Sequence, residues 1–276
     1  MSKKLLALYG LKFNPFSSQL PTDALWSSPP IEEFCWRIEQ QVGEGGFALV
    51  TGDPGTGKSA ALRLLAARLT RLRDLTVGIL TRPQASLADF YRELGHLFGV
   101  ALSPHNRWAS AKVLREKWLQ HLDASRLRPL LLVDEAQEMA LAVFSELRLL
   151  ASADLDSRSI LTVVLAGDCR LGARLESLEL LPLASRIRSR LRTEALPPQQ
   201  LLACLQHLLS AAGNPKLLPP ALLQTLSEHA AGNLRLLVNL GNDLLQAALR
   251  QERETLDEKL YFEVFASEPK PRSKRP

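Results

Sequence analysis

Apolar and polar residues follow two alternating patterns along the chain up to residue 196. Short apolar runs are typical of buried strands, and longer stretches with an apolar residue every three or four positions are typical of amphipathic helices. The expected strands are 47–51, 76–80, 130–133, 160–166 and, more weakly, 186–194. The expected helices are 58–72, 86–98, 110–122 and 144–151. Because strands and helices alternate, the pattern predicts an α/β fold with a parallel sheet flanked by helices.

The pattern changes after Pro197 and Pro198, where strand-like runs disappear. The later stretches with helical spacing are 199–212, 220–230, 234–250 and 256–265. Thr255 and Glu258 have the spacing of a capping box at the start of the last stretch. We therefore expect a small all-helical domain after the α/β domain.

The composition of the 276 residues is that of an ordinary globular protein, with 46% hydrophobic and 23% charged residues. A chain of this length can bury a core unaided, which excludes a disordered chain, a collagen and a disulfide-built miniprotein. Its apolar runs are far shorter than the roughly 20 residues that cross a bilayer, and residues 1–10 lack the features of a secretory signal. We therefore expect a cytoplasmic protein with no membrane partner.

Cysteines and histidines show no metal-binding pattern. Cys35, Cys169 and Cys204 are far apart, and the five histidines are scattered. Structural zinc sites need closely spaced ligands, so no zinc site is predicted. Cysteines of this kind are typical of reduced thiols in the cytoplasm.

The net charge of +5 is unevenly distributed. Residues 266–276 contain four basic side chains and one acidic side chain, so the rest of the chain is nearly neutral. Residues 268–276 offer no apolar side chain for burial, and we expect a basic, disordered tail. A basic tail on a nearly neutral body is weak support for a polyanionic partner.

The clearest chemical signal is the run Gly52, Asp53, Pro54, Gly55, Thr56, Gly57, Lys58 and Ser59. It fits the phosphate-binding motif G-x-x-x-x-G-K-[ST], follows an expected strand and opens an expected helix. Glycines allow backbone N–H groups to surround phosphate oxygens, and the start of a helix attracts the same anion. We predict that residues 52–60, up to Ala60, bind ATP, with Lys58 on the β- and γ-phosphates and Ser59 on Mg²⁺.

A second signal is the pair Asp134 and Glu135, directly after the apolar run 130–133. Ligands bind at the carboxyl ends of the strands in open parallel sheets, so both carboxylates are expected at the same edge as the phosphate loop. We predict that Asp134 holds Mg²⁺, directly or through water. Glu135 is predicted to be the general base or positioning group for the attacking water.

Asp168 follows the expected strand 160–166 and Gly167. Its carboxylate either contacts the γ-phosphate or the attacking water, or belongs to an ordinary Gly-Asp turn.

Arg235, near the start of an expected helix, is unfavourably placed for the helix dipole. That position is explained either by a contact with nucleotide phosphate or by plain surface exposure.

Arginines occupy every second position from residue 186 to residue 192. On a strand all of them share one face, where like charges are unfavourable unless they meet anions. A neighbouring subunit's γ-phosphate explains one of them, and DNA phosphate explains others. The alternative is a solvated, basic edge strand.

Together, these residues give the chain a resemblance to AAA+ ATPases, from about Leu8 to Phe265. In that family Asp168 corresponds to sensor 1, Arg186 or Arg190 to the arginine finger, and Arg235 to sensor 2 in a helical lid. The resemblance implies ATP and Mg²⁺ as ligands, ATP hydrolysis as the activity, and a homo-oligomer with sites shared between subunits. Sensor 1 is usually Thr, Asn or Gln, so Asp168 departs from the family pattern.

Two stretches, 79–84 and 163–171, are most similar to the transposition ATPases of the TnsC, TniB, MuB and IstB kind. This resemblance implies an ATPase that binds double-stranded DNA without sequence preference and recruits or regulates a DDE transposase. It also implies assembly as a hexameric or heptameric ring or a helical filament. In that group the loops after the second strand line the DNA channel. The candidate DNA contacts, through phosphates, are Arg82, Gln84, Arg107 and Lys112.

The alternative is an ExeA-like ATPase of secretion or cell-envelope assembly that acts on a protein partner. Residues 9–16 resemble the opening segment of ExeA-type proteins and of their transposon relatives. ExeA-type proteins add a transmembrane helix and a peptidoglycan-binding region, neither of which we expect here. The expected domains are an N-terminal linker segment (1–30), an AAA+ α/β nucleotide-binding domain (31–196), a helical lid (197–265) and the basic tail (266–276).

Overall fold

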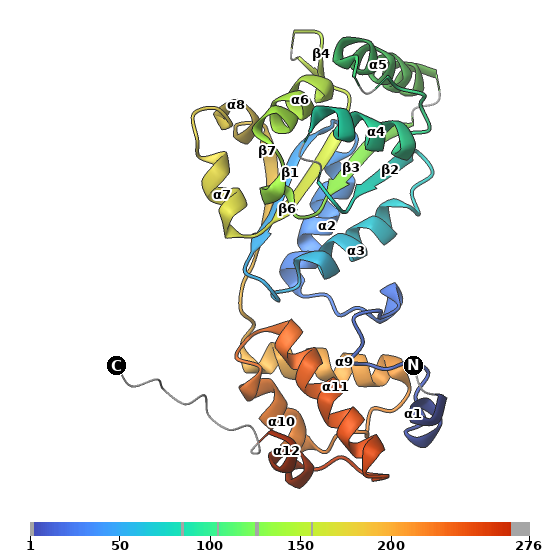
Figure 1. Ribbon diagram of the computed structural model, residues 1–276, viewed down its shortest axis with the longest axis vertical. Helices are drawn as coiled ribbons and strands as arrows, with labels where there is room; N and C mark the ends of the chain where they lie inside the picture. Colours follow the sequence, from blue (N-terminus) through green and yellow to red (C-terminus); the bar gives the residue numbers. More distant parts are fainter. Residues whose placement is uncertain (1–2, 84–85, 104, 125–126, 156, 266–276) are drawn as a thin grey trace. The chain divides into compact units, whose positions relative to one another are not determined.

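The computed structural model describes residues 3–83, 86–103, 105–124, 127–155 and 157–265. The chain divides into two compact units (Figure 1). The sheet unit is Ser27–Thr193, and the helical unit combines Met1–Trp26 with Glu194–Pro276. This division falls at residues 193 and 194, three residues before the expected boundary at 196 and 197. The basic tail lies outside the described residues.

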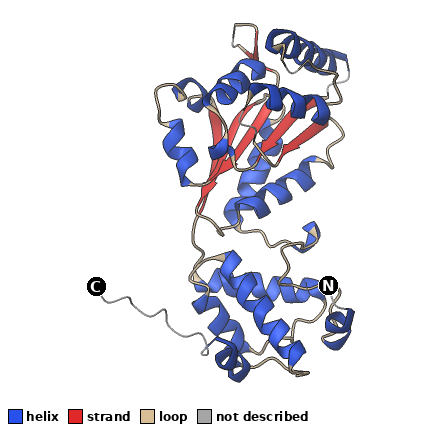
Figure 2. Cartoon of the chain, viewed as in Figure 1, coloured by secondary structure: helices blue, strands red, loops and turns tan. Residues whose placement is uncertain are grey.

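The sheet unit is built on five parallel strands, which confirms the expected α/β fold. They are β1 (Gly46–Gly52), β2 (Leu75–Leu80), β3 (Arg128–Val133), β6 (Thr162–Gly167) and β7 (Ile187–Thr193). Their order across the sheet is β2-β3-β6-β1-β7, so β1 pairs with both β6 and β7. The strands of this sheet are drawn in red in Figure 2. A separate two-stranded antiparallel ribbon joins β4 (Ser152–Ala153) to β5 (Arg158–Ser159).

Helices cover both faces of the sheet (Figure 1). Successive side chains of a strand point to opposite faces, so each strand contributes to two apolar clusters. One cluster joins Leu132 and Val164 to α2 (Pro29–Gln41) and α3 (Lys58–Leu69). The other cluster joins Leu131 and Leu165 to the opposite layer of helices. That layer contains α4 (Leu87–Leu97), α5 (Arg107–Ala124), α6 (Leu141–Ala151), α7 (Cys169–Leu175) and α8 (Leu181–Ala184).

The helical unit contains α9 (Pro198–Ala212), α10 (Pro220–His229), α11 (Leu234–Arg250) and α12 (Glu258–Phe265). The N-terminal segment packs into this unit, which differs from the linker expected for residues 1–30. That segment includes α1 (Lys3–Leu8) and the short 3-10 helix η1 (Thr22–Ala24), and Leu5, Tyr9 and Phe16 are buried in the core. Gly241 makes room for Phe16, since a Cβ there would lie 2.4 Å from the Phe16 ring.

Among the described residues, no helix has both the length and the apolar character that a membrane span requires.

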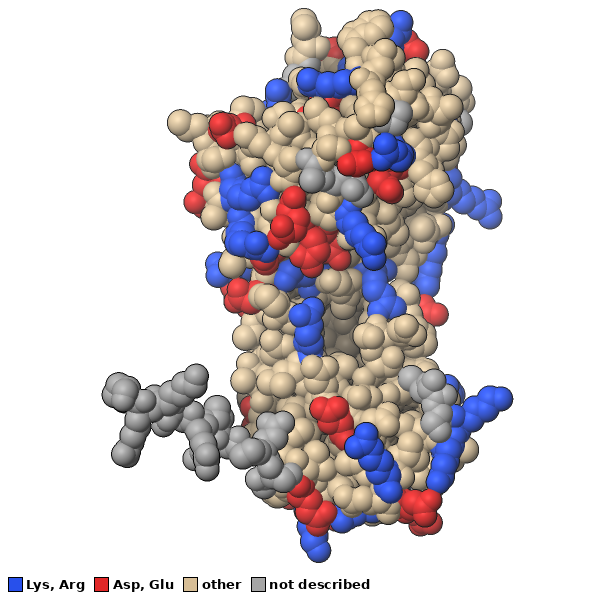
Figure 3. Space-filling model, viewed as in Figure 1, with Lys and Arg blue, Asp and Glu red and all other residues tan. Residues whose placement is uncertain are grey.

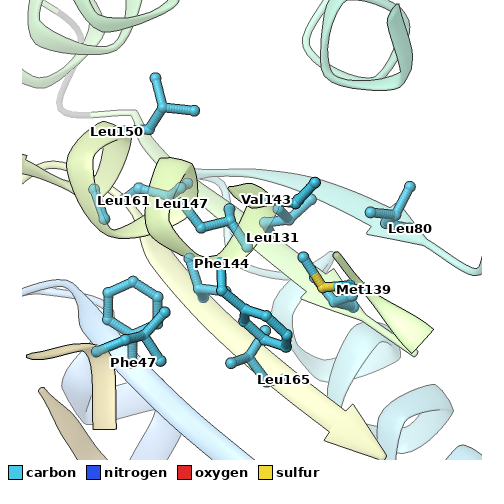
Figure 4. Packing of buried hydrophobic residues seen from close by; sticks show 14 of the residues in the cluster. Phe47, Leu80, Leu131, Met139, Val143, Phe144, Leu147, Leu150, Leu161 and Leu165 are labelled. Atoms are coloured by element: carbon cyan, nitrogen blue, oxygen red, sulfur yellow. The ribbon is translucent and has the colours of Figure 1, made fainter. Parts of the chain in front are cut away.

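The core beneath α6 generates a stability prediction. Phe144 is fully buried and packs with Leu131 and Leu165 of the sheet (Figure 4). Phe144→Ala leaves a cavity there, so we expect the free energy of unfolding to fall by about 3–5 kcal/mol. Urea denaturation followed by tryptophan fluorescence measures the change, because Trp118 is buried in the same cluster. Leu178→Ala, at an 86% exposed position, is the control and should change stability by less than about 0.5 kcal/mol. Equal effects of the two substitutions would contradict the packing described.

Candidate functional site

Three predicted site segments meet at one edge of the sheet. In a parallel sheet all carboxyl ends lie at the same edge. β1 and β3 both pair with β6, so their carboxyl ends flank that of β6. The phosphate loop follows β1, Asp134 and Glu135 follow β3, and Asp168 follows β6. The structure therefore brings these residues together, as their positions after strands predict.

The loop between β1 and α3 has a backbone that depends on its glycines. Gly55 and Gly57 have φ angles of 87° and 102°, in the left-handed region that favours glycine. A Cβ on Gly52 would lie 2.1 Å from Thr193 Oγ1 and 2.3 Å from the Thr193 carbonyl oxygen. Thr56 Oγ1 donates to the carbonyl of Asp53 at 2.8 Å and lies 2.7 Å from Thr193 Oγ1. The loop is thus held against the neighbouring strand β7.

Lys58 carries a buried charge at the start of α3. The residue is 9% exposed, and its ammonium donates to the carbonyl oxygens of Gly52 at 2.8 Å and Asp53 at 2.9 Å. No carboxylate of the described residues lies within salt-bridge distance of it. A buried ammonium without a paired anion is costly, and the helix start beside it adds positive potential. This arrangement fits a phosphate group in the loop. The other predicted ATP contacts, Asp53, Pro54 and Ala60, belong to the same loop and to the start of α3.

Ser59 and Asp134 place two oxygen ligands side by side. Ser59 Oγ lies 3.4 Å from Asp134 Oδ2, and the Glu135 N–H donates to Asp134 Oδ1 at 3.0 Å. Burial raises the pKa of the Asp134 carboxyl above its usual range. A bound cation opposes that effect, and hydroxyl and carboxylate oxygens suit Mg²⁺. The residues present therefore fit a magnesium ion, which Ser59 and Asp134 would hold.

Glu135 has an unusual backbone conformation. Its φ is +53°, a left-handed conformation that is unfavourable for a residue other than glycine, and its side chain is exposed. Strain of this kind clusters at functional sites. The carboxylate accepts a hydrogen bond from the side-chain amide of Gln137. Sequence reasoning missed Gln137, for which the only signal is an amide two residues after the acid pair.

Asp168 is engaged in a local structural contact. Its carboxylate caps α7 by accepting the Arg170 N–H at 2.9 Å, and it pairs with the Arg170 guanidinium at 2.8 Å. Its hydrogen bonds with Arg170 hold the pKa of Asp168 below its usual range. Both contacts compete with a role toward the γ-phosphate, so that role stays a prediction.

The predicted arginines occur around β7, at an edge of the sheet. Arg188 and Arg190 are exposed, as is Arg192, because the strand alternates buried and exposed positions. Arg186 precedes the strand and is partly buried, with its guanidinium on the Pro182 carbonyl. Arg190 Nη2 lies 3.5 Å from the Ala184 carbonyl oxygen.

A cavity of about 260 Å³ opens where β1 and β7 begin. Its lining combines arginine and serine side chains: Arg148, Arg158, Arg186, Arg188, Ser152, Ser157, Ser159 and Ser185. Glu44 pairs with Arg188 at 2.6 Å, and Asp123 pairs with Arg158 at 2.9 Å. The beginnings of the strands lie at the end of the sheet opposite the phosphate loop.

The remaining predicted residues are dispersed. Arg235 is exposed in the first turn of α11, in the helical unit. Arg82 is exposed after β2, and Lys112 is exposed on α5. Arg107 is engaged in a salt bridge, at 2.5 Å, with the buried carboxylate of Glu146. Gln84 lies outside the described residues.

Comparisons with known proteins show which proteins the chain is similar to. Residues 40–175 match the AAA domain family. The chain is 31% identical over 238 residues, 84% of its length, to General secretion pathway protein A of Aeromonas hydrophila. It spans only 42% of that relative.

Two solved structures show the same fold at low identity. Cdc6p of Pyrobaculum aerophilum has a TM-score of 0.71 and 18% identity, over 91% of this chain and 70% of its own. The Drosophila ORC structure bound to DNA also has a TM-score of 0.71 and 18% identity, over 95% of this chain and 65% of its own.

The buried ammonium generates a binding prediction. Lys58→Met keeps the side-chain length but removes the charge, so we expect the affinity for ATP to fall by roughly 10- to 100-fold. The free energy of unfolding without nucleotide should change by less than about 1 kcal/mol, because a buried charge is removed together with its hydrogen bonds. Calorimetric titration with ATP and Mg²⁺ measures the first quantity, and urea denaturation measures the second.

Lys117→Met is the matched control, because Lys117 also donates to two carbonyls, those of Phe98 and Gly99. It should leave ATP affinity unchanged. Equal affinity losses in the two variants would contradict the phosphate role of Lys58.

Proposed function

We propose that this protein, an AAA+ ATPase, uses ATP hydrolysis to act on a protein partner in secretion or cell-envelope assembly. The similarity to General secretion pathway protein A carries this proposal, because it extends over most of the chain. The chain spans less than half of that relative, so the proposal concerns the ATPase part and its coupling to a partner.

The nucleotide chemistry follows from the edge of the sheet where β1, β3 and β6 end. The backbone N–H groups of residues 55–59 and the Lys58 ammonium bind the β- and γ-phosphates. Ser59 and Asp134 hold Mg²⁺, which when bound neutralises charge on the phosphate oxygens. Glu135, exposed beside them, orients the attacking water and accepts its proton. Arg235 of the helical unit is a further candidate contact for phosphate.

The basic cavity at the start of β7 supports a site shared between subunits. Arg186 lines a cavity rich in guanidinium and hydroxyl groups, both of which bind phosphate. Arg186 lies at the opposite end of the sheet from the phosphate loop of its own subunit. We therefore propose that Arg186 contacts a nucleotide bound to a second copy of the chain. Arg190 is the alternative candidate for this role. A ring or filament of identical subunits repeats such a head-to-tail contact.

A second candidate function is the regulation of a DDE transposase on double-stranded DNA. The exposed arginine row on β7 favours it, because phosphate contacts of this kind bind DNA without sequence preference. The fold is also shared with an ORC structure bound to DNA. However, basic and acidic side chains are intermixed on the face drawn in Figure 3. The curated relative points to a protein partner, and we therefore place the DNA role second.

The two candidate functions differ in whether the assembly of subunits requires DNA. Glu135→Gln is expected to bind ATP and hydrolyse it slowly, so the ATP-bound assembly accumulates. We expect this variant to assemble equally well with and without a random-sequence duplex, at about 50 mM salt where phosphate contacts are strong. Sedimentation measures the assembly, and electron microscopy shows whether DNA is coated.

Lys58→Met is the control and should stay unassembled with ATP. ATP-dependent coating of the duplex that Lys58→Met abolishes would overturn the protein-partner proposal and favour the transposase role. Neighbouring genes give a second test, since secretion genes support the first candidate and a DDE transposase gene supports the second.

A shared site generates a mixing prediction. Arg186→Ala and Glu135→Gln should each hydrolyse ATP poorly alone, because each removes one half of every shared site. Mixed in equal amounts, they should recover about a quarter of the wild-type rate, the share of neighbouring pairs that combine both intact halves. A steady-state phosphate-release assay measures the recovery.

Arg190→Ala is mixed in the same way to identify the arginine, and Arg192→Ala is the control that should be active alone. If neither Arg186→Ala nor Arg190→Ala recovers activity in mixtures, the site is not shared through these arginines.

A further inference from the structure

The side chain of Gln137 connects two parts of the nucleotide site. Gln137 lies in the 3-10 turn η2 (Ala136–Glu138) that follows the acid pair, and it is 6% exposed. Its Nε2 donates to Glu135 Oε2, and its Oε1 accepts the backbone N–H of Asp168 at 3.2 Å. The amide therefore spans from the carboxylate after β3 to the end of β6, and both of its ends have partners.

The turn that carries Gln137 is fastened to α7. The Arg174 guanidinium donates to the carbonyl of Gln137 and, at 2.7 Å, to that of Met139. Arg170 pairs with Glu138 at 2.8 Å. The position of the Gln137 amide is thus set by the end of β6 and by the helix that follows it.

Gly167 provides the space for this amide. A Cβ at position 167 would lie 2.4 Å from Gln137 Oε1, closer than real Cβ contacts. A side chain there would displace the amide or the nearby Leu171, whose Cδ2 would be 2.9 Å away. The Gln137 amide therefore occupies a space that is open because residue 167 has no side chain.

Glu135 needs an external contact to have a defined orientation. Its side chain is exposed, and its backbone is in the left-handed region. Within the described part of the chain, the Gln137 amide is the only side-chain donor that contacts its carboxylate. The amide contacts Oε2, and among the described residues no side chain donates to Oε1.

We propose that Gln137 is a positioning residue for ATP hydrolysis, which holds the Glu135 carboxylate in the orientation that receives the attacking water. This inference rests on the proposed role of Glu135. Since the same amide accepts the Asp168 N–H, a shift of the end of β6 changes the orientation of Glu135. Gln137 thereby couples the general base to the strand on which sensor 1 is expected.

The test is a double-substitution cycle on steady-state ATP hydrolysis in the full-length protein. Gln137→Ala should lower kcat by about 10- to 100-fold, because a misdirected base costs rate. KM and the binding of a slowly hydrolysed ATP analogue should stay within about twofold. In the Glu135→Gln background, Gln137→Ala should cause no further loss, since the residue acts only through Glu135. A merely structural role would lower the rate in both backgrounds.

Gly167→Ala is expected to displace the Gln137 amide without substituting Gln137 itself. It should reproduce the kcat loss of Gln137→Ala and leave analogue binding unchanged. Gly172→Ala is the matched control on α7, because a Cβ there has no neighbour within 4 Å among the described residues. It should retain the wild-type rate.

The outcomes separate this inference from the proposed function. If Glu135→Gln is slow and Gln137→Ala retains or raises kcat, the positioning role of Gln137 is wrong and the proposed function is unaffected. An equal loss of kcat and of analogue binding in Gln137→Ala also overturns it. If Glu135→Gln hydrolyses ATP at the normal rate, the assignment of the general base fails, and the role of Gln137 fails with it.

Discussion

The buried ammonium of Lys58 is the constraint on which the nucleotide site depends. A charge with two carbonyl partners and no paired carboxylate among the described residues is costly to bury. The glycine conformations after β1, the start of α3 and the contact of Thr56 with Thr193 hold it in that position. Contacts within the protein therefore define the shape of the loop, and a bound phosphate would supply a countercharge to the ammonium. The position of β7 matters to this loop because Thr193 is its support.

The strand pattern of the sheet unit could be predicted from the sequence because buried parallel strands are nearly continuous apolar runs. The same reasoning placed the phosphate loop and the pair Asp134–Glu135 at one edge, since both follow such runs. The order of the strands could not be obtained in this way. It depends on the pairing of β1 with β6 and β7, which are more than a hundred residues away in the chain.

Contacts between distant residues account for what the sequence did not reveal. The N-terminal segment was expected to be a linker, but Phe16 fits against Gly241, and no local pattern announces that contact. Arg107 was expected to contact DNA, yet its charge is engaged by the buried Glu146. The contact of Asp168 with Arg170 is local by comparison, and the role of Asp168 toward the γ-phosphate stays a prediction beside the alternative of a Gly-Asp turn. The charge of a side chain and its position in the sequence suggest a role. Its contacts in the folded structure decide whether that charge is available for the role.

The division of the chain also bears on the order in which it folds during synthesis. The sheet unit is complete when Thr193 has been made, so it can fold while the rest of the chain is still being translated. The N-terminal segment is made before the sheet unit, but its apolar side chains belong to a core whose other half begins at Glu194. Leu5, Tyr9 and Phe16 must therefore stay exposed until the last third of the chain appears. These side chains are made before the sheet unit but are buried only after it, which makes them a natural binding target for chaperones.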